Sequence, residues 1–171
     1  MRLFPVFCLA TVLAAPAFAA EKPVALGTFK NWSAYTAGTG ADKTCYVLSQ
    51  PVASDPKNVT RGSIYFLISD FPARKAKAEP QIVPGYAYPD NGTVSVTVGN
   101  DKWTFFTKNE GDKGSAWLKS TADEAKLVAA LQKGSRAVVT GASSRGTTTT
   151  DAYSLSGITA ALQKAHAECK M

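Results

Sequence analysis

Two cysteines, Cys45 and Cys169, are the residues of this 171-residue chain whose chemistry is easiest to assign. They could form a structural disulfide or a redox-active pair. Reactive cysteines usually occur as Cys-x-x-Cys or in an exposed, electropositive setting, whereas these two lie near opposite ends of the chain. Cys169 also continues an apolar helical stripe that includes Ile158, Leu162 and Ala165. The sequence therefore favours a structural disulfide between Cys45 and Cys169.

The single histidine, His166, is a candidate for catalysis or metal binding only if partners can be found for it. A Ser-His-Asp triad needs an identifiable base and nucleophile, and a zinc site needs further His or Cys ligands at suitable spacing. The sequence offers neither. Since a lone histidine on a terminal helix is typical of a solvated surface residue, we predict no catalytic residue, no cofactor and no metal site.

Carboxylates and one small-residue loop are the remaining candidates. A glycosidase needs two carboxylates that converge in a cleft, whereas carboxylates at turns usually bond to the local backbone. We expect local roles for six of them, Asp42, Asp70, Asp90, Asp101, Asp112 and Asp151. The loop at residues 141–146 (GASSRG) could cradle an anion, but it lacks the lysine and the strand-to-helix placement of a phosphate loop. A hairpin turn is the favoured interpretation.

The first twenty residues predict export. Met1-Arg2 is a short basic segment, residues 3–13 are apolar, and Ala17-Phe18-Ala19 has the small-x-small pattern of a signal peptidase site. We expect cleavage after Ala19 or Ala20, which leaves a single domain at residues 21–171. Cys8 is lost with the signal, so two cysteines enter an oxidising compartment, where a disulfide is the default. The expected location is periplasmic or secreted.

Charge and hydropathy exclude two classes of partner. The chain has 19 basic and 13 acidic residues, and the basic ones are scattered apart from Arg74, Lys75 and Lys77. Nucleic-acid binders concentrate such charge on one face, so we exclude nucleic acid as a partner. The longest apolar run after the signal, residues 64–68, is far too short to cross a bilayer. We therefore expect no transmembrane segment in the mature chain.

Short period-2 segments rich in β-branched and aromatic residues predict a mainly β fold. The expected strands cover residues 29–35, 45–49, 62–69, 93–98, 102–107, 135–141 and 146–153. Residues 64–68 are apolar on both faces, which predicts a central strand that is covered on both sides. Gly99-Asn100 predicts a tight hairpin. Residues 51–58 and the basic stretch around Arg74 are expected to be irregular.

Two helices are expected in the C-terminal third. Thr121 and Glu124 form a capping-box pattern, and Gly134 is expected to end the first helix in the left-handed conformation, which places it at residues 121–133. The second helix is expected at residues 157–169. Together these elements predict a single antiparallel β-sandwich or a partly closed β-barrel with two packed α-helices.

Motifs over nearly the whole mature chain resemble a known family. In the N-terminal half these are residues 32–35 (WSAY), 45–51 (CYVLSQP), 61–62 (RG) and 64–67 (IYFL). In the C-terminal half they are residues 133–136 (KGSR), 143–147 (SSRGT), 150–157 (TDAYSLSG), 159–162 (TAAL) and the late Cys169. In order and spacing, they are similar to the invasion-associated locus B family.

The resemblance implies an exported protein of alphaproteobacteria with a cell-envelope or secreted role, of which invasion of host cells, especially erythrocytes, is a specialisation in pathogens. The family has no assigned catalytic residues, so the implied role is non-enzymatic interaction with envelope or host-surface proteins. The alternative is a periplasmic carrier that holds a small ligand in an apolar pocket of the β-domain. Trp103, Phe105 and Phe106 could line such a pocket, although plain core packing is favoured for them.

Overall fold

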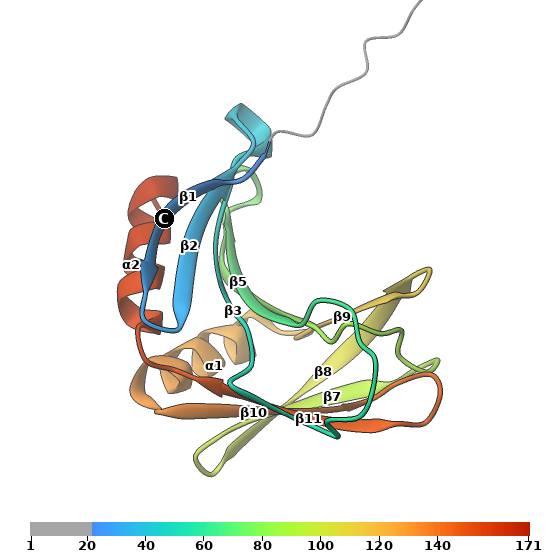
Figure 1. Cartoon of the computed structure of the whole chain (residues 1–171). Helices are drawn as coiled ribbons and strands as arrows, with labels where there is room; N and C mark the ends of the chain where they lie inside the picture. Colours follow the sequence, from blue (N-terminus) through green and yellow to red (C-terminus); the bar gives the residue numbers. More distant parts are fainter. Residues whose placement is uncertain (1–21) are drawn as a thin grey trace, which may run out of the picture.

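One antiparallel sheet and two α-helices make up the fold in the computed structural model, which describes residues 22–171 (Figure 1). The helices are α1 (Thr121–Lys133) and α2 (Ile158–Cys169). The strands are β1 (Val24–Phe29), β2 (Trp32–Ala37), β3 (Thr44–Ser49), β4 (Ala53–Asp55), β5 (Tyr65–Phe71), β6 (Ala76–Val83), β7 (Thr93–Val98), β8 (Asp101–Glu110), β9 (Lys113–Trp117), β10 (Arg136–Ala142) and β11 (Thr148–Ser154). The predicted signal peptide lies outside the described residues.

The prediction of a mainly β, antiparallel fold with two helices is confirmed. The strands pair in the order β1-β2-β3-β5-β6-β9-β8-β7-β10-β11-β4. Within residues 22–171 the two end strands, β1 and β4, do not pair with each other, so the sheet is strongly curved but not closed into a barrel (Figure 1). No helix in this part of the chain is long and apolar enough to cross a membrane.

The core lies on the face of the sheet that the helices cover. Helix α2 packs against β1, β2, β3 and β5, and α1 packs against β6 and β8. Trp32 and Tyr153 both contact the ring of Phe66, with ring centroids 5.9 and 5.6 Å away, and all three side chains are fully buried. The indole nitrogen of Trp32 donates to the carbonyl of Ser154 at 2.9 Å. The first and last thirds of the chain are thereby packed together.

The other face of the sheet, here called the outer face, is only half-buried. Residues 64–68 were expected to be covered on both sides, and this expectation is wrong. Phe66 and Ile68 point into the core, but Tyr65 and Leu67 are only half-buried on the opposite face. The outer face of β5 carries no helix (Figure 1), so Tyr65 and Leu67 keep part of their surface in contact with solvent.

Strand register extends this outer face across the sheet. Leu48 of β3 pairs with Leu67, Leu67 pairs with Gln81 of β6, Gln81 pairs with Trp117 of β9, and Trp117 pairs with Phe106 of β8. These five residues, here called the outer row, lie on one face because directly opposed residues in neighbouring strands share a face. Each of them is half-buried, and none belongs to the core cluster.

The hairpins predicted at Gly99-Asn100 and at residues 141–146 are present. Four other local expectations differ from the structure. The expected strand at residues 29–35 is a hairpin, because Lys30 has a φ of 55° between β1 and β2. Residues 51–58 contain the short edge strand β4, and the basic stretch runs into β6, which was missed because it contains Pro80. Strand β9, which begins Lys-Gly, was also missed.

The ends of α1 differ from the expected caps. Ser120, rather than Thr121, is the N-cap, and its hydroxyl accepts a hydrogen bond from the Asp123 backbone amide at 3.4 Å. Gly134 is not left-handed, because its φ is −80°. A Cβ at this position would lie 2.6 Å from a methyl carbon of Val98. Glycine is required here because the helix end packs closely against β7.

Replacing Gly134 tests this close packing. We expect Gly134→Ala to lower the free energy of unfolding by about 1–3 kcal/mol, because an added methyl group overpacks the contact with Val98. Urea denaturation measures the change. Lys133→Ala, at an exposed position of the same helix end, is the control and should change stability by less than about 0.5 kcal/mol. Equal stability of Gly134→Ala and the natural protein would contradict the explanation.

Candidate functional site

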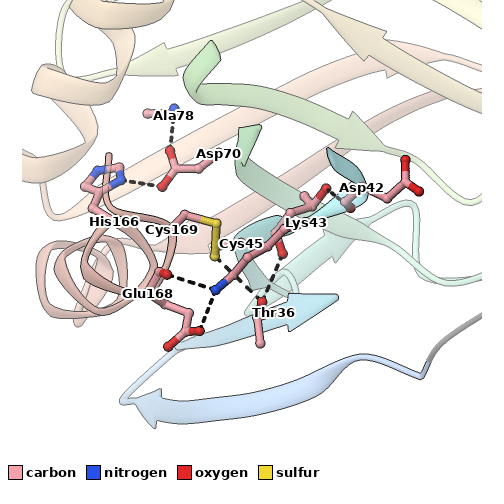
Figure 2. The surroundings of a disulfide bond; sticks show 10 residues. Thr36, Asp42, Lys43, Cys45, Asp70, Ala78, His166, Glu168 and Cys169 are labelled. Carbon is pink, nitrogen blue, oxygen red and sulfur yellow. Dashed lines mark hydrogen bonds and ion pairs between the residues drawn. A yellow bond between two sulfur atoms is a disulfide. The ribbon is translucent and has the colours of Figure 1, made fainter. Parts of the chain in front are cut away.

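Cys45 and Cys169 are joined by a disulfide, with Cα atoms 5.9 Å apart (Figure 2). Cys45 lies on β3, and Cys169 is the last residue of α2. Both residues are buried, with exposed fractions of 0% and 5%. Burial restricts thiol exchange, so the bond joins α2 to the sheet rather than offering a redox centre.

Asp70 and His166 form a second link between the sheet and α2 (Figure 2). His166 Nδ1 lies 2.6 Å from one carboxylate oxygen of Asp70, whose other oxygen accepts a hydrogen bond from the Ala78 amide at 2.8 Å. The expectation of a solvated histidine is therefore wrong, whereas Asp70 keeps the expected bond to a nearby backbone amide and also contacts α2. Asp70 is buried in β5, and it holds Ala78, whose φ is 55°, in an irregular part of β6.

The Asp70–His166 pair does not form a catalytic triad. Among residues 22–171, no serine, threonine or cysteine side chain hydrogen-bonds to His166, and no group of three His, Cys, Asp or Glu residues is placed to hold a metal. Lys43 adds a third link to the same helix end, because its Nζ lies 2.8 Å from the Glu168 carboxylate. This hydrogen bond lowers the pKa of Glu168 below its ordinary value. All three links position α2.

A buried ion pair lies between Arg61 and Asp151. The guanidinium donates to both carboxylate oxygens, at 2.8 and 2.6 Å, and also to the Pro84 carbonyl at 2.9 Å. The Ser54 hydroxyl donates to the same carboxylate at 2.6 Å. Asp151 was expected at a turn, but it lies inside β11 with a side chain that is 4% exposed. Burial opposes the charge on Arg61, yet its bonds to Asp151 raise the pKa of the guanidinium.

Three tyrosines surround this ion pair. Tyr86 lies under the Arg61 guanidinium, 5.1 Å from ring centroid to Cζ, and its hydroxyl is 2.7 Å from that of Thr149. Tyr88 and Tyr153 are buried, and burial raises the pKa of each hydroxyl above its ordinary value. Neither hydroxyl has a hydrogen-bond partner among the described residues. The region is a polar cluster inside the core in which the charges of Arg61 and Asp151 are paired with each other.

The loop at residues 141–146 forms the β10–β11 hairpin, as expected. Its Ser143 hydroxyl accepts a hydrogen bond from the Thr147 amide at 3.2 Å, which closes the turn. Arg145 is exposed at the mouth of a hollow of about 360 Å³ that Arg61 and Tyr86 also line. Because Arg61 is bound to Asp151, Arg145 is the charged group of this hollow that faces solvent.

The larger hollow of this region is a groove of about 550 Å³, which opens to solvent beside the outer row. It lies where β6 leaves β9, since these strands pair only at Gln81–Trp117 and Ile82–Ala116. Its lining comprises Gly62, Ser63, Gln81, Val83, Gly85, Tyr86, Lys108, Glu110, Asp112, Lys113, Gly114, Ser115 and Trp117. We call this hollow the β6–β9 groove.

The three aromatic residues considered for a carrier pocket are distributed over both faces. Phe105 is fully buried in the core, and Trp103 packs against the core. Phe106 lies on the outer face, where its ring centroid is 6.0 Å from that of Trp117. The β6–β9 groove is therefore not the pocket that the sequence suggested. Trp117, which lines it, was missed because β9 was missed.

The disulfide generates one prediction. Non-reduced protein should be two hydrogen atoms lighter than reduced protein by mass spectrometry, and the Cys45→Ala/Cys169→Ala double variant should lose about 2–4 kcal/mol of stability, because the unfolded chain is no longer constrained by a long loop. Thermal denaturation measures the loss. Two free thiols in the protein isolated under non-reducing conditions would rule the bond out.

The buried ion pair generates another prediction. Arg61→Met should destabilise the fold by about 3–5 kcal/mol, because it leaves the Asp151 charge buried without a partner. Adding Asp151→Asn should recover part of that loss. Arg74→Met, which breaks the exposed Arg74–Glu79 pair, is the control and should cost at most about 1 kcal/mol. Similar losses for Arg61→Met and Arg74→Met in urea denaturation would contradict this assignment.

Comparison with known proteins identifies the family of this chain. Residues 32–166 match the model of the invasion associated locus B (IalB) protein family. The structure is similar to the crystal structure of invasion associated protein B from Bartonella henselae, with a TM-score of 0.58 and 15% sequence identity over 86% of this chain and 99% of that chain. No curated protein sequence matches closely enough to indicate a relationship. Because the family model covers residues 32–166, the chain belongs to the invasion associated locus B family.

Proposed function

We propose that this protein is an exported, non-enzymatic interaction protein of the cell envelope or the secreted fraction, and that it meets its partners through the outer face of the sheet. The observation that carries the proposal is the outer row, a line of half-buried, mostly apolar side chains that no helix covers. A row of apolar side chains that stays partly accessible on a folded protein is a candidate interaction surface. Membership of the family supports a role in contact with envelope or host-surface proteins.

The non-enzymatic part of the proposal rests on the buried ionisable groups. The charged groups Asp70, Asp151 and Arg61 are each bound to structural partners. Catalysis by a side-chain nucleophile needs a nucleophile in contact with a base. The hydrogen bonds of residues 22–171 include no pair of that kind built on His166.

A second candidate function is a small-ligand carrier, and the β6–β9 groove is the observation that favours it. Its volume of about 550 Å³ lies within the range of ligand pockets. The groove, however, is open along the sheet surface and has a rim of exposed charged residues. An open groove continuous with the outer row suits contact with a partner better than enclosure of an apolar molecule.

Photo-cross-linking tests the proposed contact surface. A photoreactive phenylalanine analogue at Leu67, in the centre of the outer row, should give one reproducible cross-linked product in cell-envelope or host-membrane preparations. The same analogue at Ala129, an exposed position on α1, is the control and should not give that product.

Two results would contradict the proposal. One is equal cross-linking from positions 67 and 129, which would mean that the outer face has no special role. The other is an apolar small molecule that co-purifies in native mass spectrometry while position 67 gives no product, which would support the carrier.

A further inference from the structure

We propose that the β6–β9 groove binds a short, neutral oligosaccharide. The proposal deepens the interaction function, on which it rests, by naming the chemistry of one ligand. The surface features that support it are a floor of glycine backbone, a flat aromatic wall and a rim that carries both donors and acceptors without net charge.

Glycines make the floor of the groove. A Cβ at Gly85 would lie 2.6 Å from the carbonyl oxygen of Gly62, and a Cβ at Gly114 would lie 2.5 Å from the carbonyl oxygen of Tyr86. The same segments are joined by hydrogen bonds from Gly62 N to Gly85 O, at 2.8 Å, and from Gly114 N to Tyr86 O, at 2.9 Å. Close approach of these backbones requires glycine at positions 85 and 114, so backbone atoms rather than side chains line this part of the hollow.

Trp117 provides the aromatic wall. Its ring packs beside Phe106 with an interplanar angle of 33°, which holds the indole in place, and it remains half-buried rather than fully covered. The face of an aromatic ring carries partial negative charge. The C–H groups on one side of a pyranose ring are weakly positive and nearly coplanar, so a sugar ring stacks well on such a wall.

The rim explains why a neutral, hydroxylated ligand fits better than an ion. Lys108 and Lys113 are ammonium donors, and Glu110 and Asp112 are carboxylate acceptors, so the formal charges of the four cancel. All four are exposed, and none has an ion-pair or side-chain hydrogen-bond partner among residues 22–171. A sugar hydroxyl both donates and accepts, so it can use both kinds of group.

The polar groups lower in the groove have the same double character. The Gln81 side-chain amide donates to the Ser115 hydroxyl at 3.0 Å, and the amide oxygen of Gln81 remains available as an acceptor. Gln81 is the neighbour of Trp117 across β6 and β9. An aromatic surface beside an amide and a hydroxyl satisfies the apolar face and the polar edge of one sugar ring together.

Isothermal titration calorimetry of the purified protein tests the proposal with three probes. Chitotetraose is a neutral analogue of the β-1,4-linked glycan backbone of the bacterial cell wall, N-acetyllactosamine represents a neutral glycan of host surfaces, and hexaglutamate is an anionic peptide. Binding of either sugar supports the proposal, and the one that binds more tightly identifies the source. Absence of binding by both sugars at millimolar concentration, or tighter binding of hexaglutamate, overturns it.

Variants then locate the bound sugar. Trp117→Ala should weaken its binding at least about tenfold, and Glu110→Gln/Asp112→Asn, which keeps the shape of the rim, should also weaken it by about tenfold. Asp101→Asn, at the exposed start of β8 and outside the groove, is the control and should bind as the natural protein does. Unchanged binding by the Glu110→Gln/Asp112→Asn variant together with unchanged binding by Trp117→Ala overturns the proposal.

The outcomes separate this proposal from the proposed function. If neither sugar binds while position 67 still cross-links to a partner, the oligosaccharide proposal fails and the interaction function stands. If a sugar binds and the Trp117→Ala variant loses it, while position 67 gives no product, the groove is a glycan site and the outer row is not a protein contact.

Discussion

The fold depends on how a curved antiparallel sheet buries one of its faces. Helices α1 and α2 lie on the same side of β2, β3 and β5 (Figure 1), and Trp32, Phe66 and Phe105 fill the space between them and the strands. Burial of the apolar core to which these side chains belong supplies most of the favourable free energy of folding. The opposite face has no such cover, so Leu67 and Trp117 remain partly exposed. Both the outer row and the β6–β9 groove result from this one-sided burial.

The position of helix α2 is fixed by several links, and this helix covers the core at one end of the sheet, over β1, β2, β3 and β5. Its last turn is joined to the sheet side by the Cys45–Cys169 disulfide, by the Asp70–His166 pair and by the Lys43–Glu168 pair (Figure 2). The covalent bond acts mainly on the unfolded chain, whereas the Asp70 carboxylate also shapes the backbone of β6 through Ala78. The groove begins farther along that same strand, at Gln81. The Asp70 carboxylate that contacts α2 therefore also holds the strand that forms one side of the groove.

Local patterns predicted much of this fold, whereas interactions between distant residues were not predictable. The hairpin at Gly99-Asn100, both helices and the strand at Cys45 depend on neighbouring residues, and the sequence alone located them. Asp70 and Asp151 were assigned to turns because their partners, His166 and Arg61, are about 90 or more residues away in the chain. The apolar run at residues 64–68 was interpreted as buried on both sides. Hydrophobicity reports a tendency to leave water, but it does not distinguish a core from a binding face.

Contact through the outer face is tested most directly by hydroxyl-radical footprinting of the protein in a cell-envelope preparation and in purified form. If partners meet this face, Leu67, Phe106 and Trp117 become protected from oxidation in the envelope, while Val24 on the free edge of β1 is oxidised equally in both samples. Protection of Val24 with unchanged oxidation of Trp117 and Leu67 would place the contact on the edge of the sheet and contradict the proposed surface.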